Sequence, residues 1–253
     1  MILHRGQGAE AVSSLFEASG FVTARELHTA ADGGLEPSPY DCWRALDRAR
    51  SLAWLVDPQS DDDPLLDMEE FDHYAAPANG AVHLTVPGKL FFFPTPKDLP
   101  AGQDWDDCAD SSGAVVRRFS ARFYADLLHH LGASCVVCLG GGSAQSAAAL
   151  AARGLHVEDL GLAADGSSLL RGLDRLLSLA RAAPGAVAVY SGDGAVWPGY
   201  TGSLAAAFLI SRLGFDEGSA RAWPRLTSPW AAAAAGPAAA ALVVDTPGPG
   251  PDR

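Results

Sequence analysis

The chain has 253 residues, of which 48% are hydrophobic and 19% charged, and this composition excludes a wholly disordered or fibrous protein. Its 30 acidic residues outnumber its 18 basic ones, which gives a formal net charge of −12 at pH 7. We therefore expect no general binding to nucleic acid and no docking on an anionic membrane, because both need concentrated lysine and arginine.

Cysteine content and hydropathy favour an intracellular protein of the cytoplasm or nucleus. Four cysteines do not make the disulfide framework of a small secreted domain. The N-terminus lacks the apolar core of a signal peptide, and no apolar run is long enough to span a membrane. Cys135 and Cys138 have C-x-x-C spacing, but on a strand their side chains point to opposite faces. We expect no metal and no cofactor.

The first third of the chain predicts helices. Residues 1–30 form a moderately amphipathic helical segment, and residues 31–39 a break rich in turn-forming residues. A second helix follows over residues 40–55. Its apolar side chains share one face at helical spacing, among them Trp43, Leu46 and Leu52.

An alternation of strands and helices begins near residue 82. The expected strands end the segment 86–93 and cover residues 134–139, 155–160 and 186–190. The expected helices cover residues 120–131, 143–153, 168–182 and 203–213. We interpret residues 94–116 as a polar loop. The order predicts an α/β fold with a mostly parallel central sheet, flanked by a helical appendage at 1–81 and a tail at 231–253 rich in alanine, glycine and proline.

Several short stretches occur in an order and spacing known from one family. They are Tyr-Asp-Cys-Trp-Arg-Ala-Leu-Asp-Arg-Ala at 40–49, Glu-Phe-Asp-His-Tyr at 70–74, Asn-Gly at 79–80, Val-Pro-Gly-Lys-Leu at 86–90 and Ala-Trp-Pro-Arg-Leu-Thr-Ser-Pro at 222–229. Over about residues 35–230 they resemble the cell-division-cycle-fourteen family of dual-specificity protein phosphatases. The resemblance implies a dual-specificity or tyrosine phosphatase-like domain at 82–230, with 1–81 as the remnant of a first phosphatase-like domain. It also implies that Pro224 interrupts the helix around 222–229.

The resemblance places the phosphate-binding loop after the strand 186–190. In the family, this loop supplies a cysteine thiolate that attacks phosphorus and an arginine that grips the phosphoryl oxygens, and a separate loop supplies an aspartic acid. Here Ser191 stands at the nucleophile position and Tyr200 at the arginine position, with eight residues between them instead of five. Asp165 falls at the general-acid position. The remnant of the loop consists of Gly192, Asp193, Gly194, Gly199, Thr201 and Gly202.

These departures remove the chemistry of the family. A serine hydroxyl is un-ionised at neutral pH and needs an adjacent base, and all seven histidines lie upstream of this loop. Tyr200 lacks the fork of N–H donors that an arginine offers a phosphate dianion, and Asp193 adds negative charge to the loop. We therefore expect a pseudophosphatase that binds or scaffolds other proteins, and that phosphate, sulfate or tungstate does not stabilise.

We expect the partner to be a protein. In the family, the helix at 40–55 packs on the missing first domain, so its face with Trp43, Leu46 and Leu52 is a candidate partner surface. Acidic residues at 61–63, 69–70 and 104–107 suit a basic peptide. The resemblance also implies links to the cell cycle, the centrosome or the cilium.

Two enzymatic alternatives stay open. A working, divergent phosphatase for phosphoserine-proline substrates would use Ser191 as a rearranged nucleophile and Asp165 as the acid. A nucleotide- or S-adenosylmethionine-binding enzyme would cradle a phosphate on the glycines 140–142, which lie between a strand and a helix. Glu158 or Asp159, at the end of the next strand, would then bind a ribose.

Overall fold

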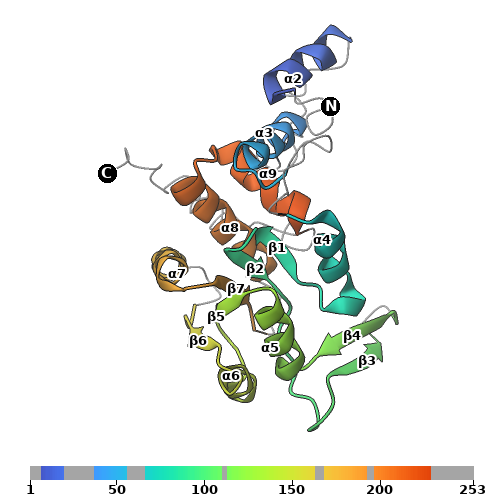
Figure 1. Cartoon of the computed structure of the whole chain (residues 1–253), viewed down its shortest axis with the longest axis vertical. Coiled ribbons are helices and arrows are strands. Elements are labelled where there is room, and N and C mark those ends of the chain that lie inside the picture. Colours follow the sequence, from blue (N-terminus) through green and yellow to red (C-terminus); the bar gives the residue numbers. More distant parts are fainter. Residues whose placement is uncertain are drawn as a thin grey trace. The chain divides into compact units, whose positions relative to one another are not determined.

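The computed structural model describes residues 7–19, 37–55, 66–109, 113–162, 168–192 and 197–228. The chain divides into two compact units (Figure 1). The sheet unit spans Met68–Trp197, and the helical unit combines Met1–Asp67 with Pro198–Arg253. This division does not coincide with the expected segments 1–81, 82–230 and 231–253, because the C-terminal helices group with the N-terminal ones. No helix in the described ranges combines the length and the hydropathy that crossing a bilayer requires.

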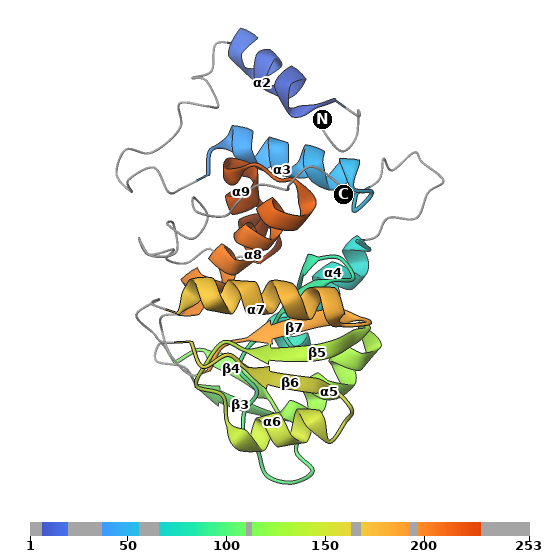
Figure 2. The same ribbon diagram turned by 90° about the vertical axis from the view of Figure 1, so that its left-hand side faces the viewer.

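Within the described ranges, the main sheet consists of five strands: β1 (His83–Val86), β2 (Leu90–Phe92), β5 (Ala133–Cys138), β6 (His156–Asp159) and β7 (Ala186–Tyr190). Their order is β1-β2-β7-β5-β6, with β1 antiparallel to β2 and the other neighbours parallel. Figure 2 shows the part of this sheet formed by β7, β5 and β6. Every residue of the central strand β7 is buried, as is usual for a parallel strand that is covered on both faces. The predicted α/β class with a mostly parallel central sheet is therefore confirmed.

Helices cover both faces of the parallel strands. The longer helices of the sheet unit are α5 (Ala121–His130), α6 (Ala144–Ala151) and α7 (Leu169–Ala182), and the short α4 (Met68–Ala75) and η2 (Pro77–Asn79) precede β1. Glu158 on β6 binds Arg175 of α7, whereas Val157 and Asp159 line a groove beside α6. Successive side chains of a strand point to opposite faces, so α6 and α7 lie on opposite sides of the sheet.

Serine side chains begin two of these helices. Ser120 accepts a hydrogen bond from the amide of Phe123 at 3.2 Å, and Ser143 accepts one from the amide of Gln145 at 3.2 Å. Such caps satisfy amides that the first turn of a helix leaves unpaired. Because the caps are readable in the sequence, α5 and α6 begin within one residue of their expected positions.

The expected polar loop at 94–116 instead contains most of a hairpin, formed by β3 (Trp105–Ala109) and β4 (Val115–Phe119). Asp106 pairs in register with Arg118 and Asp107 with Arg117, and both are ion pairs, at 2.8 and 2.7 Å. The loop prediction was wrong because these strands are matched by opposite charges rather than by alternating apolar residues.

The helical unit contains α2 (Ala9–Ala18), α3 (Pro39–Ser51), α8 (Trp197–Leu213, from its second residue on) and α9 (Glu217–Thr227). Of the helix expected over residues 1–30, the described part is α2. Pro224 does not interrupt α9, contrary to our expectation. A proline removes one N–H from a helix but keeps its carbonyl, and the amide of Ser228 donates to the carbonyl of Pro224 at 2.7 Å.

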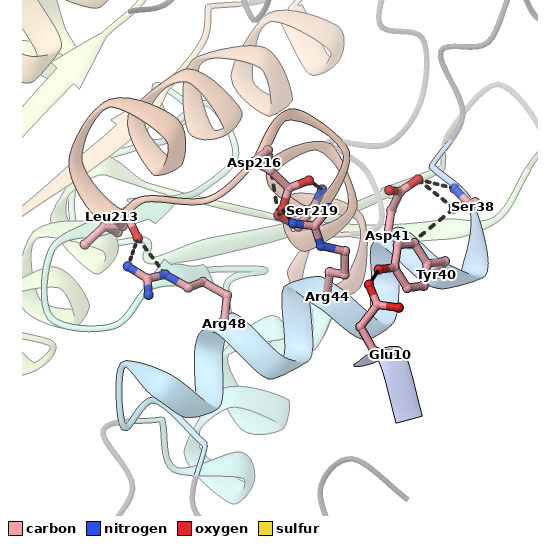
Figure 3. A network of polar contacts seen from close by, with 9 residues as sticks. All are labelled: Glu10, Ser38, Tyr40, Asp41, Arg44, Arg48, Leu213, Asp216 and Ser219. Carbon is pink, nitrogen blue, oxygen red and sulfur yellow. Dashed lines mark hydrogen bonds and ion pairs between the residues drawn. The ribbon is translucent and has the colours of Figure 1, made fainter. Parts of the chain in front are cut away.

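Two arginines of α3 bind residues in the turn between α8 and α9 (Figure 3). Nε and Nη2 of Arg48 donate to the carbonyl of Leu213, the last residue of α8, at 2.9 and 2.6 Å. Arg44 forms a 3.1 Å ion pair with Asp216, whose side chain also caps α9. A cation at the C-terminal end of a helix satisfies its last carbonyls and its dipole, so this contact stabilises the helical unit.

Candidate functional site

The last residues of three neighbouring parallel strands form a row across the sheet: Tyr190 of β7, Cys138 of β5 and Asp159 of β6. Tyr190 is in register with Cys138, and Cys138 with Asp159, so their side chains lie on one face. Ligands of α/β proteins bind outside the carboxyl ends of parallel strands. The loops that follow these three strands therefore hold the candidate site.

Two glycine-containing loops pack directly against each other at this edge. The amide of Gly192 donates to the carbonyl of Gly140 at 2.9 Å, and a Cβ on Gly192 would lie 2.3 Å from the oxygen of Gly141. A Cβ on Gly142 would lie 2.7 Å from Sγ of Cys138 and 2.8 Å from the hydroxyl of Tyr190. The glycines that we considered as a phosphate cradle thus allow a close approach of backbone and side chains.

Ser191, at the expected nucleophile position, is half-buried at the start of the loop after β7. Its carbonyl accepts a hydrogen bond from the hydroxyl of Thr95. Its own hydroxyl makes no hydrogen bond to any residue that the structure describes. The neighbouring Tyr190 is 1% exposed, and burial raises the pKa of its phenol. Tyr190 therefore stays neutral at pH 7 and offers Ser191 no anionic base.

The remaining expected site residues are divided by the fold. Three lie outside the described residues: Asp165, Asp193 and Gly194. Four lie in the first turns of α8, in the helical unit: Gly199, Tyr200, Thr201 and Gly202. We expected the helix to begin at residue 203, but Pro198 at the second position of α8 suits a first helical turn, where its fixed φ is helical and no N–H is needed. The arginine position is therefore helical.

The candidate partner surface on α3 is partly covered by the chain itself. Trp43, Leu46 and Leu52 are each half-buried. The ring of Trp43 meets the ring of Phe16 on α2 edge-on, with 5.5 Å between the centroids. α3 also packs along α9, where a Cβ on Gly218 would lie 2.1 Å from a carboxylate oxygen of Asp41. The apolar face that stays accessible on α3 is thus smaller than the sequence suggests.

The acidic residues near the hairpin are already paired. Asp104 forms a 2.6 Å ion pair with Arg122, and the Arg117 guanidinium beside Asp107 lowers the pKa of that carboxyl. Asp106 is held by Arg118, as described above. These carboxylates are therefore weaker candidates for a basic peptide than their sequence implies, whereas residues 61–63 lie outside the described part of the chain.

The groups expected to hold a nucleotide have other partners. Both carboxylate oxygens of Glu158 accept hydrogen bonds from Arg175, at 2.5 and 2.6 Å, and this contact lowers the pKa of Glu158. At the N-terminus of α6, the carboxylate of Asp98 accepts hydrogen bonds from the hydroxyls of Ser143 and Ser146, at 2.6 and 2.9 Å. A protein carboxylate thus already occupies the place that favours a phosphate, which argues against the nucleotide alternative.

The two central cysteines are core residues. Cys135 lies near Glu158 and Arg175, and burial raises the pKa of its thiol to about 11. Cys138 lies on the other face, beside Tyr190, and burial raises the pKa of its thiol as well. Both are free thiols, in agreement with the expectation that their side chains point apart. Within the described ranges, no three His, Cys, Asp or Glu side chains are grouped to hold a metal ion.

Comparison with known proteins yields structural similarities only. Neither a scan against protein-family models nor a search of curated proteins finds a match. TpbA of P. aeruginosa in complex with phosphotyrosine is 21% identical, with 58% of this chain and 98% of that chain covered, at a TM-score of 0.35. A second structure of TpbA is 20% identical, with 58% and 99% covered, at 0.34. A protein described as a tyrosine phosphatase from Leishmania major is 18% identical, with 62% and 87% covered, at 0.37. The fold class of this chain rests on its own strand order rather than on these similarities.

Proposed function

We propose that this chain is a non-catalytic relative of the dual-specificity phosphatases, a pseudophosphatase that acts by binding other proteins. The observation that carries the proposal is the environment of Ser191. This serine follows the buried strand β7, where the resemblance places a thiolate, and its neighbour Tyr190 is a buried, neutral phenol. A serine hydroxyl without a base is a poor nucleophile at neutral pH, so we expect no phosphoryl transfer.

Loss of phosphate binding follows from two further features. The amide of Gly192, the first after Ser191, donates to the carbonyl of Gly140 and is not directed at an oxyanion. Tyr200, at the arginine position, cannot supply two parallel charge-assisted hydrogen bonds. Each such bond contributes about 1.5–3 kcal/mol, so their absence removes most of the affinity for a phosphoryl group.

The binding half of the proposal concerns the accessible part of α3. Because Asp104, Asp106 and Asp107 are paired with arginines, we narrow the proposed partner surface to Trp43 and Leu46 on α3 and to Leu52, the residue that follows its last turn. The narrower assignment to the cell-division-cycle-fourteen family, with roles in the cell cycle or at the centrosome or cilium, rests on the sequence resemblance.

Assays with an aryl phosphate and with phosphoserine-proline peptides test the catalytic half. Wild-type protein is compared with Ser191→Ala and with Ser211→Ala, a matched serine on α8 whose hydroxyl donates to the carbonyl of Phe208. We expect the same background rate from all three proteins. Turnover that Ser191→Ala abolishes and Ser211→Ala keeps would show a working phosphatase and end the proposal.

Affinity purification from the source cells tests the binding half. The variant Leu52→Asp changes the proposed surface, and Leu170→Asp changes a leucine on α7 that is 55% exposed. We expect partners of the wild-type protein to be retained by Leu170→Asp and lost by Leu52→Asp, with unchanged melting temperatures. Identical recovery by all three proteins would contradict a role for the surface formed by Trp43, Leu46 and Leu52.

A further inference from the structure

The hairpin of β3 and β4 forms the second sheet of the sheet unit, and within the described ranges it has only these two strands (Figure 1). β4 lies next to η2, whereas β3 pairs with no other described strand. A two-stranded hairpin is marginally stable by itself, and an unpaired strand edge is a ready template for a further strand. The outer edge of β3 is therefore a candidate docking site for an extended peptide.

The register of the hairpin decides which backbone groups of β3 face outward. The amide of Ser120 donates to the carbonyl of Asp104 at 2.9 Å, so these two residues form a hydrogen-bonded pair. Such pairs alternate with pairs whose N–H and C=O groups point away from the neighbouring strand. Trp105, Asp107 and Ala109 therefore direct their backbone groups outward. The carbonyl of Trp105 accepts from a nearby side chain, whereas the outward groups of Asp107 and Ala109 make no hydrogen bond with any described residue. Both residues are exposed, so an incoming strand can reach them.

The side chains of β3 select the chemistry of that peptide. Asp106 and Asp107 are neighbours in the strand, so one lies on each face of the hairpin. Arg117 donates to both carboxylate oxygens of Asp107, at 2.7 and 2.8 Å. Arg118 donates to one oxygen of Asp106 at 2.8 Å. A carboxylate has about four acceptor sites, so each aspartate can accept from a further cation on its other side. A third strand is therefore favoured when it places two adjacent basic residues beside these aspartates.

Charge also disfavours a second copy of this chain as the occupant. When two β3 strands pair antiparallel about their middle, Asp107 faces its own copy, or Asp106 faces the Asp107 of the copy. Like charges directly opposite each other destabilise a strand pair. Charge alone attracts a basic peptide only weakly here, because both carboxylates already have arginine partners. The backbone hydrogen bonds of the added strand must therefore provide most of the binding.

We propose that the outer edge of β3 binds an extended segment of a partner protein that carries two adjacent lysines or arginines. The segment adds a third, antiparallel strand to the hairpin, and its backbone exchanges N–H···O=C hydrogen bonds with Asp107 and Ala109. Its two basic side chains lie beside Asp106 and Asp107, one on each face. This edge belongs to the sheet unit, whereas the partner surface proposed above belongs to the helical unit. Binding at β3 does not depend on the absence of catalysis, so the two proposals can fail separately.

Three synthetic peptides test this proposal by NMR titration of the full chain, with the amides of Asp107 and Ala109 as reporters. The probe is acetyl-Thr-Val-Thr-Lys-Arg-Val-Thr-amide. One control replaces Lys-Arg by Glu-Glu, and the other carries an N-methyl group on the lysine, which keeps the charge but removes an N–H that strand pairing needs. We expect saturable shifts with the probe and binding that is about tenfold weaker for each control. Equal binding of either control, or no saturable shift with the probe, would overturn the proposal.

A charge-swapped chain assigns the binding to this edge. It exchanges the acidic and basic partners of both ion pairs of the hairpin, by Asp106→Arg, Asp107→Arg, Arg117→Asp and Arg118→Asp. The pairs are kept and the charge of β3 is reversed, so we expect this chain to prefer the Glu-Glu peptide. The control exchanges an ion pair elsewhere in the sheet unit, by Glu158→Arg with Arg175→Glu, and should keep the preference of the wild type. A swapped chain that still prefers the basic probe would refute the site.

The three peptides decide the question on the wild-type chain even where the swapped hairpin does not form. A dilution series of the chain alone tests the remaining occupant, a second copy. We expect the amides of Asp107 and Ala109 to keep their shifts at all concentrations of the chain. Shifts of these amides that grow with the concentration of the chain would show that a second copy occupies the edge and would overturn the proposal as well.

Discussion

Tyr124 and Tyr190 both pack against the ring of Phe93, yet their hydroxyls differ. The ring centroids lie 4.8 Å from Phe93 for Tyr124 and 5.3 Å for Tyr190. Both tyrosines are 1% exposed, and burial raises the pKa of both phenols. Tyr124 donates to the carbonyl of Gly80 at 2.9 Å, whereas the hydroxyl of Tyr190 has no hydrogen-bond partner among the described residues. One core thus contains a satisfied and an unsatisfied phenol.

This difference predicts opposite effects of the same substitution. Tyr124→Phe leaves the buried carbonyl of Gly80 unpaired and should lower the free energy of unfolding by about 1–2 kcal/mol. Tyr190→Phe removes a hydroxyl that makes no hydrogen bond and should be neutral or stabilising. Urea denaturation of both variants measures the effects. A loss for Tyr190→Phe as large as that for Tyr124→Phe would mean that the hydroxyl of Tyr190 is bonded in solution.

The arginine contacts of α3 predict unequal losses in the helical unit. Arg48→Met removes two hydrogen bonds from a guanidinium to the carbonyl of Leu213 and should cost about 2 kcal/mol of stability. Arg44→Met removes an ion pair that is 44% and 36% exposed on its two sides, and should cost less than about 1 kcal/mol. Tryptophan fluorescence, to which Trp54 and Trp223 of this unit contribute with their rings 5.3 Å apart, follows unfolding. A loss of stability for Arg44→Met that equals or exceeds the loss for Arg48→Met would contradict this ranking.

The contact between Arg175 and Glu158 predicts a pH-dependent loss. Hydrogen bonds from Arg175 hold the pKa of Glu158 below its ordinary value. A carboxyl whose pKa is lower in the folded chain adds stability above the unfolded value of about 4.3, and this stability is lost as the pH falls through the folded value. Arg175→Met should therefore be less stable than wild type at pH 7.

The control for this prediction is Arg171→Met, at an exposed position of the same helix. Thermal unfolding between neutral and acid pH should show that the difference in melting temperature between Arg175→Met and wild type decreases as Glu158 is protonated. The control should show no such change. A difference in melting temperature that is as large at acid pH as at pH 7 would mean that the ion pair does not cause it.

Much of the sheet unit could be predicted because local signals agree with the final fold. The buried run at β7 and the serine caps of α5 and α6 are such signals. The hairpin of β3 and β4 was not predicted, because its strands are matched by charge pairs. These pairs can be recognised only once the register of the two strands is known. The grouping of α8 and α9 with α3 depends on contacts such as that between Arg48 and Leu213, which are 165 residues apart.

The candidate site could be located from the sequence only in part. The resemblance to a phosphatase loop that follows a buried strand identified Ser191 and Gly192. The row of Tyr190, Cys138 and Asp159 was missed as a unit, because strand order and register bring these three residues together. Their shared position at the ends of predicted parallel strands was the signal that pointed to it.

Binding of an oxyanion at the loop after β7 tests the central claim most directly. Tungstate, a phosphate analogue, is titrated into the labelled chain while the amide resonances of Ser191 and Gly192 are followed. Because the Gly192 amide is held by the carbonyl of Gly140, we predict that neither resonance shifts in a saturable way at millimolar tungstate. A saturable shift at Gly192 that phosphate competes away would show a functioning phosphate-binding loop and contradict the account.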